Sequence, residues 1–402
     1  MNEFSWIFLI ALALMTGIEI WLSLRQRRHV LANRDEVPAA FREQIGLAAH
    51  QKAADYTAAK GAQMRRESLF GAVVLILWTL GGGLAMLSGA WEGFGWSAMT
   101  TGVVLILSFL VIGSLLELPL SWYRTFVMEE KFGFNRNTPA LFLGDFGKQI
   151  LLMLVLGAPI AWVTLWLMNS TGEFWWLYLW AAWMVFAVVM MWAYPAFIAP
   201  LFNKFTPLDD ANLKQKVESL LQRCGFKSQG IYVMDGSRRS GHGNAYFTGL
   251  GNNKRIVFFD TLLNTLNEDQ IEAVLAHELG HFRRKHVVKN MLMMAVMSLV
   301  GLALLGWAST QTWFYTGLGV ETQNNAIALI LFMLVIPVFS FFLHPLMTSM
   351  SRKYEFEADA YAASVSNADD LITALVALYK ENASTLTPDP LVSAIYDSHP
   401  PA

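Results

Sequence analysis

Long apolar stretches alternate with polar segments along the whole chain. A helix needs about 20 mostly apolar residues to cross a bilayer. Seven stretches meet this requirement, roughly at residues 4–24, 69–91, 97–120, 149–169, 174–202, 288–308 and 325–349. The pattern therefore predicts a mainly α-helical membrane protein with seven spans.

The first apolar stretch is predicted to be a retained span. It begins Met1-Asn2-Glu3, without the basic segment of a signal peptide, and runs into Arg25-Gln26-Arg27-Arg28, where a cleavage site would carry small residues. Basic residues favour the cytosolic side of a membrane. We therefore expect the chain to start outside, with the following segments inside: 25–68, 121–148, 203–287 and 350–402.

The distribution of basic residues supports this orientation. All 29 Lys and Arg residues fall in the inner segments when Lys289, at the mouth of the sixth span, is counted with them. The two largest polar segments, 203–287 and 350–402, then share one side of the membrane. They can build one site.

The composition agrees with a membrane protein and narrows the chemistry. Only 15% of the residues are charged, whereas a soluble protein usually has about 25%. The formal net charge of −2 gives no support to a nucleic-acid partner. The one cysteine, Cys224, excludes an internal disulfide and a cysteine-based zinc cluster, and no accompanying motif marks it as a catalytic thiol.

The spans and polar segments divide the chain into four parts. Residues 1–202 hold spans one to five with their cytosolic loops, and residues 288–349 hold spans six and seven. Residues 203–287 are predicted to fold as a small cytosolic α+β domain, and residues 350–402 form a cytosolic C-terminal segment.

Residues 203–287 carry helix and hairpin signals. An amphipathic helix is predicted after Leu208-Asp209-Asp210. Strand-forming runs occur at 230–234, 244–247 and 255–259, and a Gly-Asn-Asn turn at 251–253 precedes the last run. Asn267, with Gln270 three residues later, predicts the capped start of a further helix.

That helix contains the sequence His277-Glu278-Leu279-Gly280-His281. Two histidines four residues apart share one helix face and can bind one Zn²⁺ together. Glu278 then points to the open coordination position, where it can take a proton from the attacking water and pass it to the leaving amine. A chance match is expected in roughly one chain in a hundred of this length, and the capped helix with uncharged flanks favours zinc.

A catalytic zinc of this kind normally has a third protein ligand. Glu355 and Asp359 follow the last span and lie four apart on a predicted helix, so both face one way, while Glu357 faces elsewhere. We expect Glu355 to bind the metal and Asp359 to orient a ligating histidine. The alternative is a solvated acidic helix face.

These motifs together make the chain resemble the type I CAAX prenyl protease family of integral-membrane zinc metallopeptidases. The resemblance covers nearly the whole chain. It is carried by the segment from Glu117 through Asn135, by Asn244-Ala245-Tyr246-Phe247, His277-Glu278-Leu279-Gly280-His281 and Glu355-Phe356-Glu357-Ala358-Asp359, and by Ser398-His399-Pro400-Pro401.

The resemblance implies a fold and a metal site. The fold is mainly α, a seven-transmembrane-helix barrel around a large chamber, with a cytosolic α+β zincin-type metalloprotease domain. One Zn²⁺ is held by His277, His281 and Glu355, with Glu278 as the base and Asp359 as a supporting residue.

It also implies substrate contacts. Substrate is expected to add as a strand beside Asn244, Ala245 and Tyr246, although Asn244 alone also fits a turn residue. His399 is expected to donate to the developing oxyanion, and the alternative is a tail histidine. Arg352 is expected to hold a substrate carboxylate, and the alternative is an anchor at the membrane surface.

The sequence therefore predicts a membrane zinc endopeptidase whose substrates are polypeptides or lipidated peptides in the bilayer. The family's named activity is removal of the last three residues of prenylated proteins. The compact chain and the lack of a retention signal permit a bacterial source, and a bacterial inner membrane is expected rather than the endoplasmic reticulum. In a bacterium, cleavage for membrane-protein quality control is the better expectation. A non-hydrolytic zinc scaffold and a transporter are the alternatives. Glu278 argues against the scaffold, and the lack of an internal repeat argues against the transporter.

Overall fold

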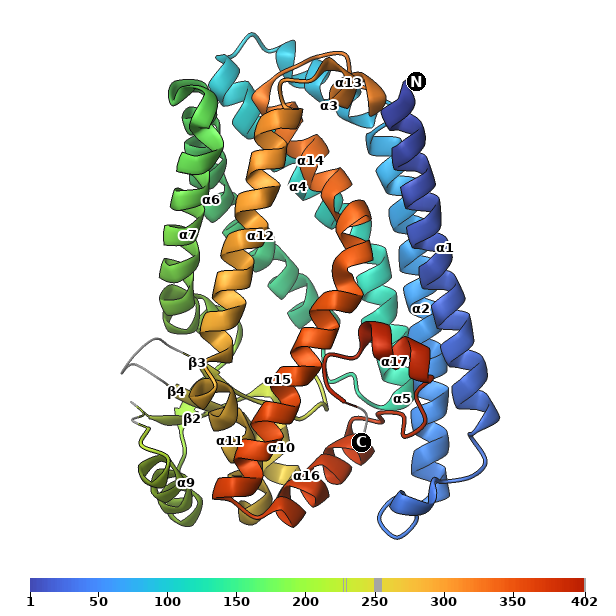
Figure 1. The fold of residues 1–402 in the computed structure, drawn as a ribbon, viewed down its shortest axis with the longest axis vertical. Coiled ribbons are helices and arrows are strands. Elements are labelled where there is room, and N and C mark those ends of the chain that lie inside the picture. The colour runs from blue at the N-terminus through green and yellow to red at the C-terminus, as the bar shows by residue number, and fades with distance from the viewer. Residues whose placement is uncertain (227, 229, 249–254, 401–402) are drawn as a thin grey trace.

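The computed structural model describes residues 1–402 except 227, 229, 249–254 and 401–402. Long helices form a bundle, and a small sheet with several shorter helices lies at one end of it (Figure 1). The described helices are α1 (Glu3–Ala32), α2 (Leu47–Trp78), α3 (Gly83–Glu92), α4 (Ala98–Tyr123), α5 (Glu130–Phe132), α6 (Pro139–Ser170), α7 (Trp175–Ala193), α8 (Ala199–Phe202), α9 (Ala211–Arg223), α10 (Asp260–Thr265), α11 (Glu268–Arg283), α12 (His286–Ala308), α13 (Thr312–Gly317), α14 (Asn325–Ser340), α15 (His344–Val365), α16 (Ala368–Glu381) and α17 (Pro390–Tyr396). The strands are β1 (Phe205–Pro207), β2 (Ile231–Met234), β3 (Ala245–Thr248) and β4 (Arg255–Phe259).

The membrane spans match the predicted apolar stretches. Within the described residues, six helices are long and apolar enough to cross a membrane, and a seventh span arises if α2 and α3 are taken together. The break between α2 and α3 bends that span by 47°. Gly82, at the break, has a φ of +78°, a backbone conformation that favours glycine. The predicted mainly α membrane fold is confirmed, with six or seven candidate spans in the part of the chain that the structure describes.

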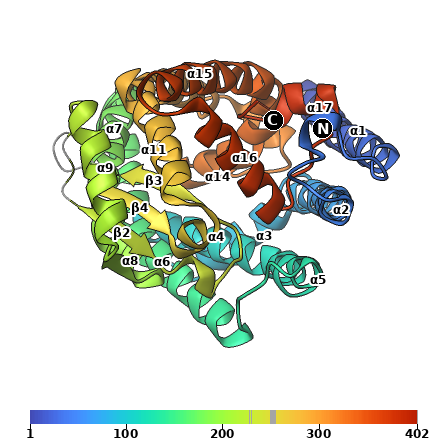
Figure 2. The same cartoon turned by 90° about the horizontal axis from the view of Figure 1, so that it is seen from below.

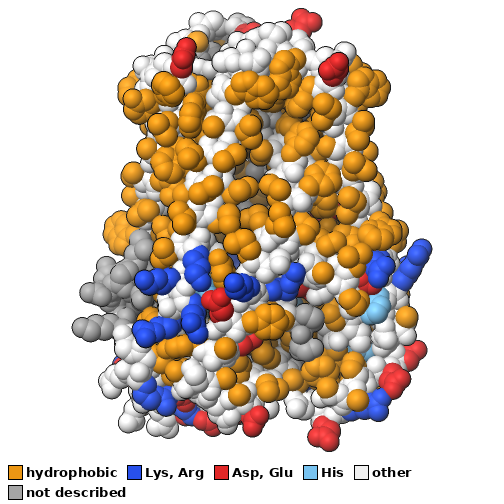
Figure 3. Space-filling view, in the orientation of Figure 1, with side chains coloured by type: hydrophobic (Ala, Val, Ile, Leu, Met, Phe, Trp, Pro, Cys, Tyr) orange, Lys and Arg blue, Asp and Glu red, His pale blue; other side chains and the backbone are white. Residues whose placement is uncertain are grey.

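The surface of the bundle carries an apolar band. Large side chains such as those of Trp6, Leu151 and Leu292 are exposed on it by 59%, 61% and 66%. Figure 3 shows this band over the upper part of the molecule, with a row of Lys and Arg side chains directly below it. Apolar side chains at this density suit a lipid environment, and the basic row marks one edge of the membrane-embedded part.

The helices form a ring when viewed from the end that carries the sheet. In Figure 2, α11 and α16 lie toward the inside of this ring, with α15 along its border. A cavity of about 710 Å³ opens between α4, α6 and the turn after α7. Polar side chains, among them Glu117, Ser121 and Gln149, line it together with apolar ones. This part of the membrane region therefore has a polar interior.

The sheet has the order β1-β2-β4-β3 in the described part of the chain. Strands β3 and β4 pair antiparallel, with Ala245 opposite Phe258, so the predicted hairpin is confirmed. The predicted turn at 251–253 lies outside the described residues. Strand β2 pairs parallel with β4, and β1 joins β2 antiparallel; the sequence pattern predicted neither pairing.

The sheet packs against helices α9 and α11. Leu213, Val217 and Leu220 of α9 are buried in one cluster with Phe258 of β4 and Leu275 of α11. This shared core fixes α11 to the sheet, and it thereby fixes the position of the histidine motif relative to β3.

Candidate active site

Helix α11 starts where the sequence predicts it. The Asn267 side chain accepts a hydrogen bond from the backbone N–H of Gln270, and the Gln270 side chain accepts one from the backbone N–H of Asn267. This reciprocal pair is a capping box. Leu275 and Leu279 are buried on one side of the helix, which leaves the two motif histidines free to point toward α15.

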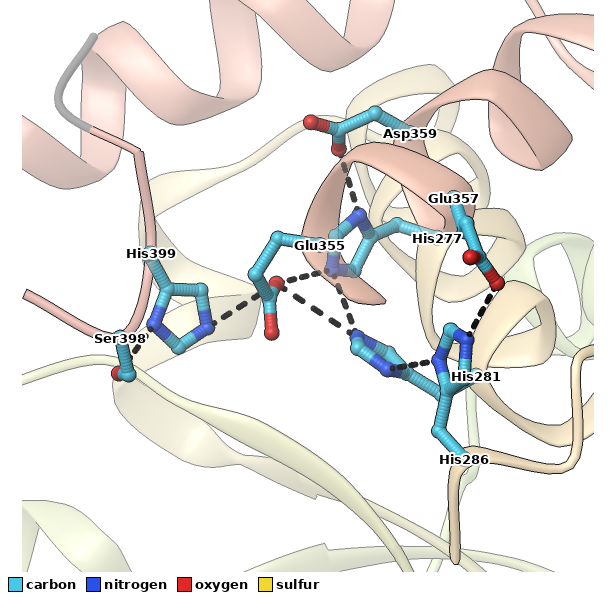
Figure 4. Close-up of polar contacts among 8 residues, drawn as sticks. All are labelled: His277, His281, His286, Glu355, Glu357, Asp359, Ser398 and His399. Carbon is cyan, nitrogen blue, oxygen red and sulfur yellow. Dashed lines mark hydrogen bonds and ion pairs between the residues drawn. The ribbon is translucent and has the colours of Figure 1, made fainter. Parts of the chain in front are cut away.

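Glu355 meets these histidines from α15. It is 5% exposed, and its Oε2 atom lies 3.3 Å from Nε2 of His277 and 3.6 Å from Nε2 of His281. The two Nε2 atoms are 3.2 Å apart (Figure 4). The structure therefore brings together the three residues that the sequence analysis predicted to share a metal ion.

The donor atoms of this group suit a divalent metal ion. One atom from each of His277, His281 and Glu355 lies within 4.8 Å of the other two. Two imidazole nitrogens and one carboxylate oxygen are a common ligand set of catalytic zinc. Glu355 Oε2 is buried and accepts no hydrogen bond within the described residues. A buried carboxylate in this state is costly unless a cation balances it, so the residues fit a metal.

Asp359 holds the first histidine. Its Oδ1 atom lies 2.8 Å from Nδ1 of His277. This contact favours a proton on Nδ1 and leaves the lone pair of Nε2 directed at Glu355. Asp359 therefore lies where the sequence analysis expected a residue that orients a ligating histidine.

The site's carboxylates also set its electrostatics. Burial lowers the pKa of His277, but the Asp359 and Glu355 carboxylates outweigh it and raise the value to about 9. The same negative charges favour a divalent cation at the ring nitrogen. Burial raises the pKa of Glu278 above its ordinary range, against the opposing effect of His277 and His281. A raised carboxyl pKa suits a group that must both accept and return a proton.

Two further residues extend the site beyond the second histidine, and sequence reasoning missed the contact between them. His286 Nδ1 lies 3.0 Å from His281 Nδ1, and His286 Nε2 lies 3.1 Å from an oxygen of Glu357. The expectation that Glu357 faces away from the metal group is correct, but it contacts His286 instead. The available signal was a third histidine, five residues after His281.

His399 approaches the site from the C-terminal segment. Its Nε2 atom lies 3.3 Å from Glu355 Oε2, and its side chain is 71% exposed. Nη1 of Arg352 donates to the backbone carbonyls of Ser393 and Asp397, at 3.4 and 3.0 Å. Arg352 therefore contacts the segment that leads to His399. Pro401 of the same motif lies outside the described residues.

The predicted substrate segment lies at the edge of the sheet. In the described part of the chain, β3 pairs only with β4, so its other edge is open. A cavity of about 390 Å³ joins this edge to the site, lined by Asn244, Ala245, Glu278, Glu355 and His399 among others. The ring of Tyr246 packs edge-on against Phe259, with centroids 6.2 Å apart.

A polar network that sequence reasoning missed supports the chain just before β3. The Asn382 side-chain oxygen accepts a hydrogen bond from the backbone N–H of Gly243 at 3.2 Å and lies 3.2 Å from Nδ1 of His242. The His242 ring stacks on Phe134 with centroids 4.3 Å apart. Residues from three separate segments thus meet here, and their meeting leaves no local signal in the sequence.

A bundle of membrane helices with a His-His-Glu group beside an open sheet edge defines a membrane metalloprotease. Comparison with known proteins supports this class. Residues 26–204 match the protein-family model for the N-terminal part of CAAX prenyl proteases, which has five membrane helices. Residues 207–402 match the family model of peptidase family M48. The chain belongs to this family and is of the CAAX prenyl protease 1 type.

Several relatives show how far the similarity extends. The CAAX prenyl protease 1 homolog of Arabidopsis thaliana is 40% identical over 286 residues, which is 71% of this chain and 68% of that protein. CAAX prenyl protease 1 of Saccharomyces cerevisiae is 39% identical, over 72% of this chain and 67% of its own length. The crystal structure of S. mikatae Ste24p superposes with a TM-score of 0.92 at 30% identity, over 100% of this chain and 97% of that one.

Proposed function

We propose that this protein is a zinc endopeptidase that cleaves polypeptides or lipidated peptides at the cytosolic face of a membrane. The observation that carries the proposal is the meeting of His277, His281 and Glu355 around one point, with Glu278 on the same helix. Zn²⁺ bound there would polarise the scissile carbonyl and lower the pKa of the attacking water.

The other side chains of the site are assigned proton transfer, stabilisation of the oxyanion and orientation of a metal ligand. Glu278 accepts the proton of the attacking water and returns it to the leaving amine. The His399 imidazole donates to the oxygen that gains negative charge. Asp359 keeps His277 in the tautomer that has its lone pair on Nε2.

Substrate binding is assigned to the open edge of β3. An extended peptide that pairs with the backbone near Asn244, Ala245 and Tyr246 would pass through the cavity in front of Glu278. Arg352 is assigned the role of holding a substrate carboxylate; in support, its Nη1 atom donates to the backbone carbonyls of Ser393 and Asp397, in the segment that leads to His399. Main-chain pairing supplies affinity that depends little on sequence.

The basic residues support a cytosolic position for the site. All the predicted inner segments are rich in Lys and Arg, which favours the cytosolic side for the sheet and the metal group. Because relatives are named CAAX prenyl proteases, a prenylated peptide is the first substrate to test. An unmodified peptide tests the alternative of general quality-control cleavage.

The decisive experiment measures cleavage of a farnesylated and an unmodified peptide by purified protein and by Glu278→Gln. We expect the substitution to lower kcat by about 100- to 10,000-fold. Glu268→Gln, at the start of the same helix, is the matched control and should keep its activity. Equal turnover by wild type and Glu278→Gln would end the proposal and would favour a scaffold or transporter. The ratio between the two peptides decides whether the prenyl group is required.

A further inference from the structure

We propose that His286 and Glu357 are positioning residues that hold the ring of His281 in its metal-binding tautomer. The inference rests on the proposed function, because it assigns a role to residues around the same metal group. It concerns side chains that neither bind the metal nor touch substrate.

The contacts form a linear chain of three side chains. Nε2 of His281 lies 3.6 Å from Glu355 Oε2, and its other nitrogen, Nδ1, lies 3.0 Å from Nδ1 of His286. Nε2 of His286 then lies 3.1 Å from Glu357 Oε2. Figure 4 shows the three residues in this order, leading away from the metal group.

The protons along this chain can be assigned from its far end. A glutamate carboxylate only accepts hydrogen bonds, so the contact with Glu357 requires a proton on Nε2 of His286. Nδ1 of neutral His286 is then an acceptor, and Nδ1 of His281 must donate to it. With its proton on Nδ1, His281 keeps its lone pair on Nε2, the atom that faces Glu355.

The opposite placement of the protons would prevent His281 from binding a metal. If Nδ1 of His286 carried the proton, Nδ1 of His281 would be the acceptor and the proton of His281 would move to Nε2. That nitrogen could no longer bind a metal. Glu357 thus selects between two tautomers of a residue that it does not contact.

His286 is held firmly enough for this task. Its side chain is 2% exposed, and its ring stacks on Tyr354 with centroids 4.3 Å apart and planes at 15°. Lys285, just before it, has a φ of 58°, and this left-handed residue makes the sharp turn from α11 into α12. Lys289 Nζ lies 3.5 Å from the same Oε2 atom of Glu357 and favours its charged form.

The arrangement parallels the one around the other histidine. Asp359 contacts His277 directly, whereas Glu357, two residues earlier on α15, points to the other side of the helix. An intervening imidazole lets this more distant carboxylate act on His281. Both imidazoles of the metal group are therefore oriented by carboxylates from α15, the helix that also supplies Glu355.

The test is the Zn²⁺ affinity of purified full-length protein, measured by competition with a chromophoric chelator. His286→Leu and Glu357→Leu should each weaken zinc binding by about 10- to 100-fold, the usual effect of losing such a supporting residue. Glu357→Gln should stay close to wild type, because its amide oxygen accepts the same hydrogen bond. Glu381→Leu, an exposed carboxylate on α16, is the matched control.

A second readout separates positioning from general loss of structure. With Co²⁺ as the probe, the visible absorption bands should change in His286→Leu and Glu357→Leu and stay unchanged in Glu381→Leu. Should His286→Leu fail to fold, Glu357→Leu decides, because the Glu357 side chain is 28% exposed and outside the packed core.

The outcomes are distinct from those of the proposed function. Wild-type affinity and spectrum in both leucine variants would overturn the positioning role, as would Glu357→Gln binding zinc as weakly as Glu357→Leu. If the wild-type protein itself bound no Zn²⁺, that result would contradict the metal site of the proposed function, and the positioning role with it.

Discussion

Gly280 of α11 lies directly against Ala358 of α15. A Cβ atom at Gly280 would lie 2.8 Å from Cα of Ala358 and 2.9 Å from its carbonyl oxygen. The missing side chain lets the two helix backbones approach closely. Since His281 follows Gly280 and Glu355 lies one turn before Ala358, this contact sets the separation of the metal-binding side chains.

Gly280→Ala should therefore weaken both the fold and the metal group. Overpacking of a tight contact typically costs about 1–3 kcal/mol, and relief requires α11 and α15 to move apart. We expect a lower Tm together with weaker Zn²⁺ binding. Gly301→Ala on α12 is the control, because its Cβ would meet nothing within 4 Å. Equal Tm and zinc affinity in wild type and Gly280→Ala would show that the helix spacing does not control the site.

Removal of the metal should abolish activity and lower stability. A ligand that binds only the folded state stabilises it by about 2.7 kcal/mol at 100 times its Kd. We expect a chelator to stop peptide cleavage and lower Tm, and added Zn²⁺ to restore both. In Glu355→Gln, Zn²⁺ should no longer raise Tm. Undiminished cleavage after complete metal removal would contradict the assignment.

Asn382→Leu should affect substrate binding more than chemistry. The Asn382 oxygen is the acceptor for the backbone N–H of Gly243 in a partly buried position, and loss of such a hydrogen bond typically costs about 0.5–1.5 kcal/mol. Loss of the bond frees the chain before β3, so KM should rise while kcat changes little. Asn382→Asp keeps the acceptor and should retain the wild-type KM, as should Asn212→Leu on the exposed face of α9. A fall in kcat at constant KM would argue against this role.

Asp389 should make stability depend on pH. It is 2% exposed; burial raises its pKa, but hydrogen bonds from Arg25 and from the backbone of Val392 and Leu391 bring it below the ordinary value. A folded-state pKa below the unfolded one stabilises the fold above about pH 4 and less as pH falls. Asp389→Ala should therefore lower the free energy of unfolding at pH 7 by roughly 0.5–2 kcal/mol for the lost helix cap, and with it the Tm.

The pH series provides the check on this assignment. The difference in Tm between wild type and Asp389→Ala should shrink as pH falls from 5 toward 3, provided that both remain folded. Asp370→Ala on α16 should show no such change. A difference that stays constant over the whole range would mean that the carboxylate charge contributes nothing.

Much of this protein was predictable because its strongest signals are local. The spans follow from apolar stretches of sufficient length, and the position of α11 follows from Asn267 and Gln270, three residues apart. The spacing of Glu355 and Asp359 gives one helix face directly after the last span, which predicts their place at the metal. Each of these inferences needs only one segment of the chain.

The remaining features depend on contacts between distant segments. His242 becomes meaningful only beside Asn382, which is 140 residues away. Strand β2 pairs in parallel with β4 through a connection that the apolar pattern does not reveal. The helix period correctly predicts that Glu357 faces away from the metal group, but its partner His286 lies 71 positions earlier in the chain. Periodicity gives the direction of a side chain along a helix but not its tertiary partner.

The metal group is divided between two helices that touch in space but are separated along the chain by the membrane helices α12 and α14. Helix α11 runs almost directly into the membrane helix α12, and α15 continues from the membrane helix α14. A water-soluble fragment cut at the bilayer surface would contain either the histidine pair or Glu355, never both on one folded piece. Activity, metal loading and inhibitor screening thus require the intact chain in detergent or lipid.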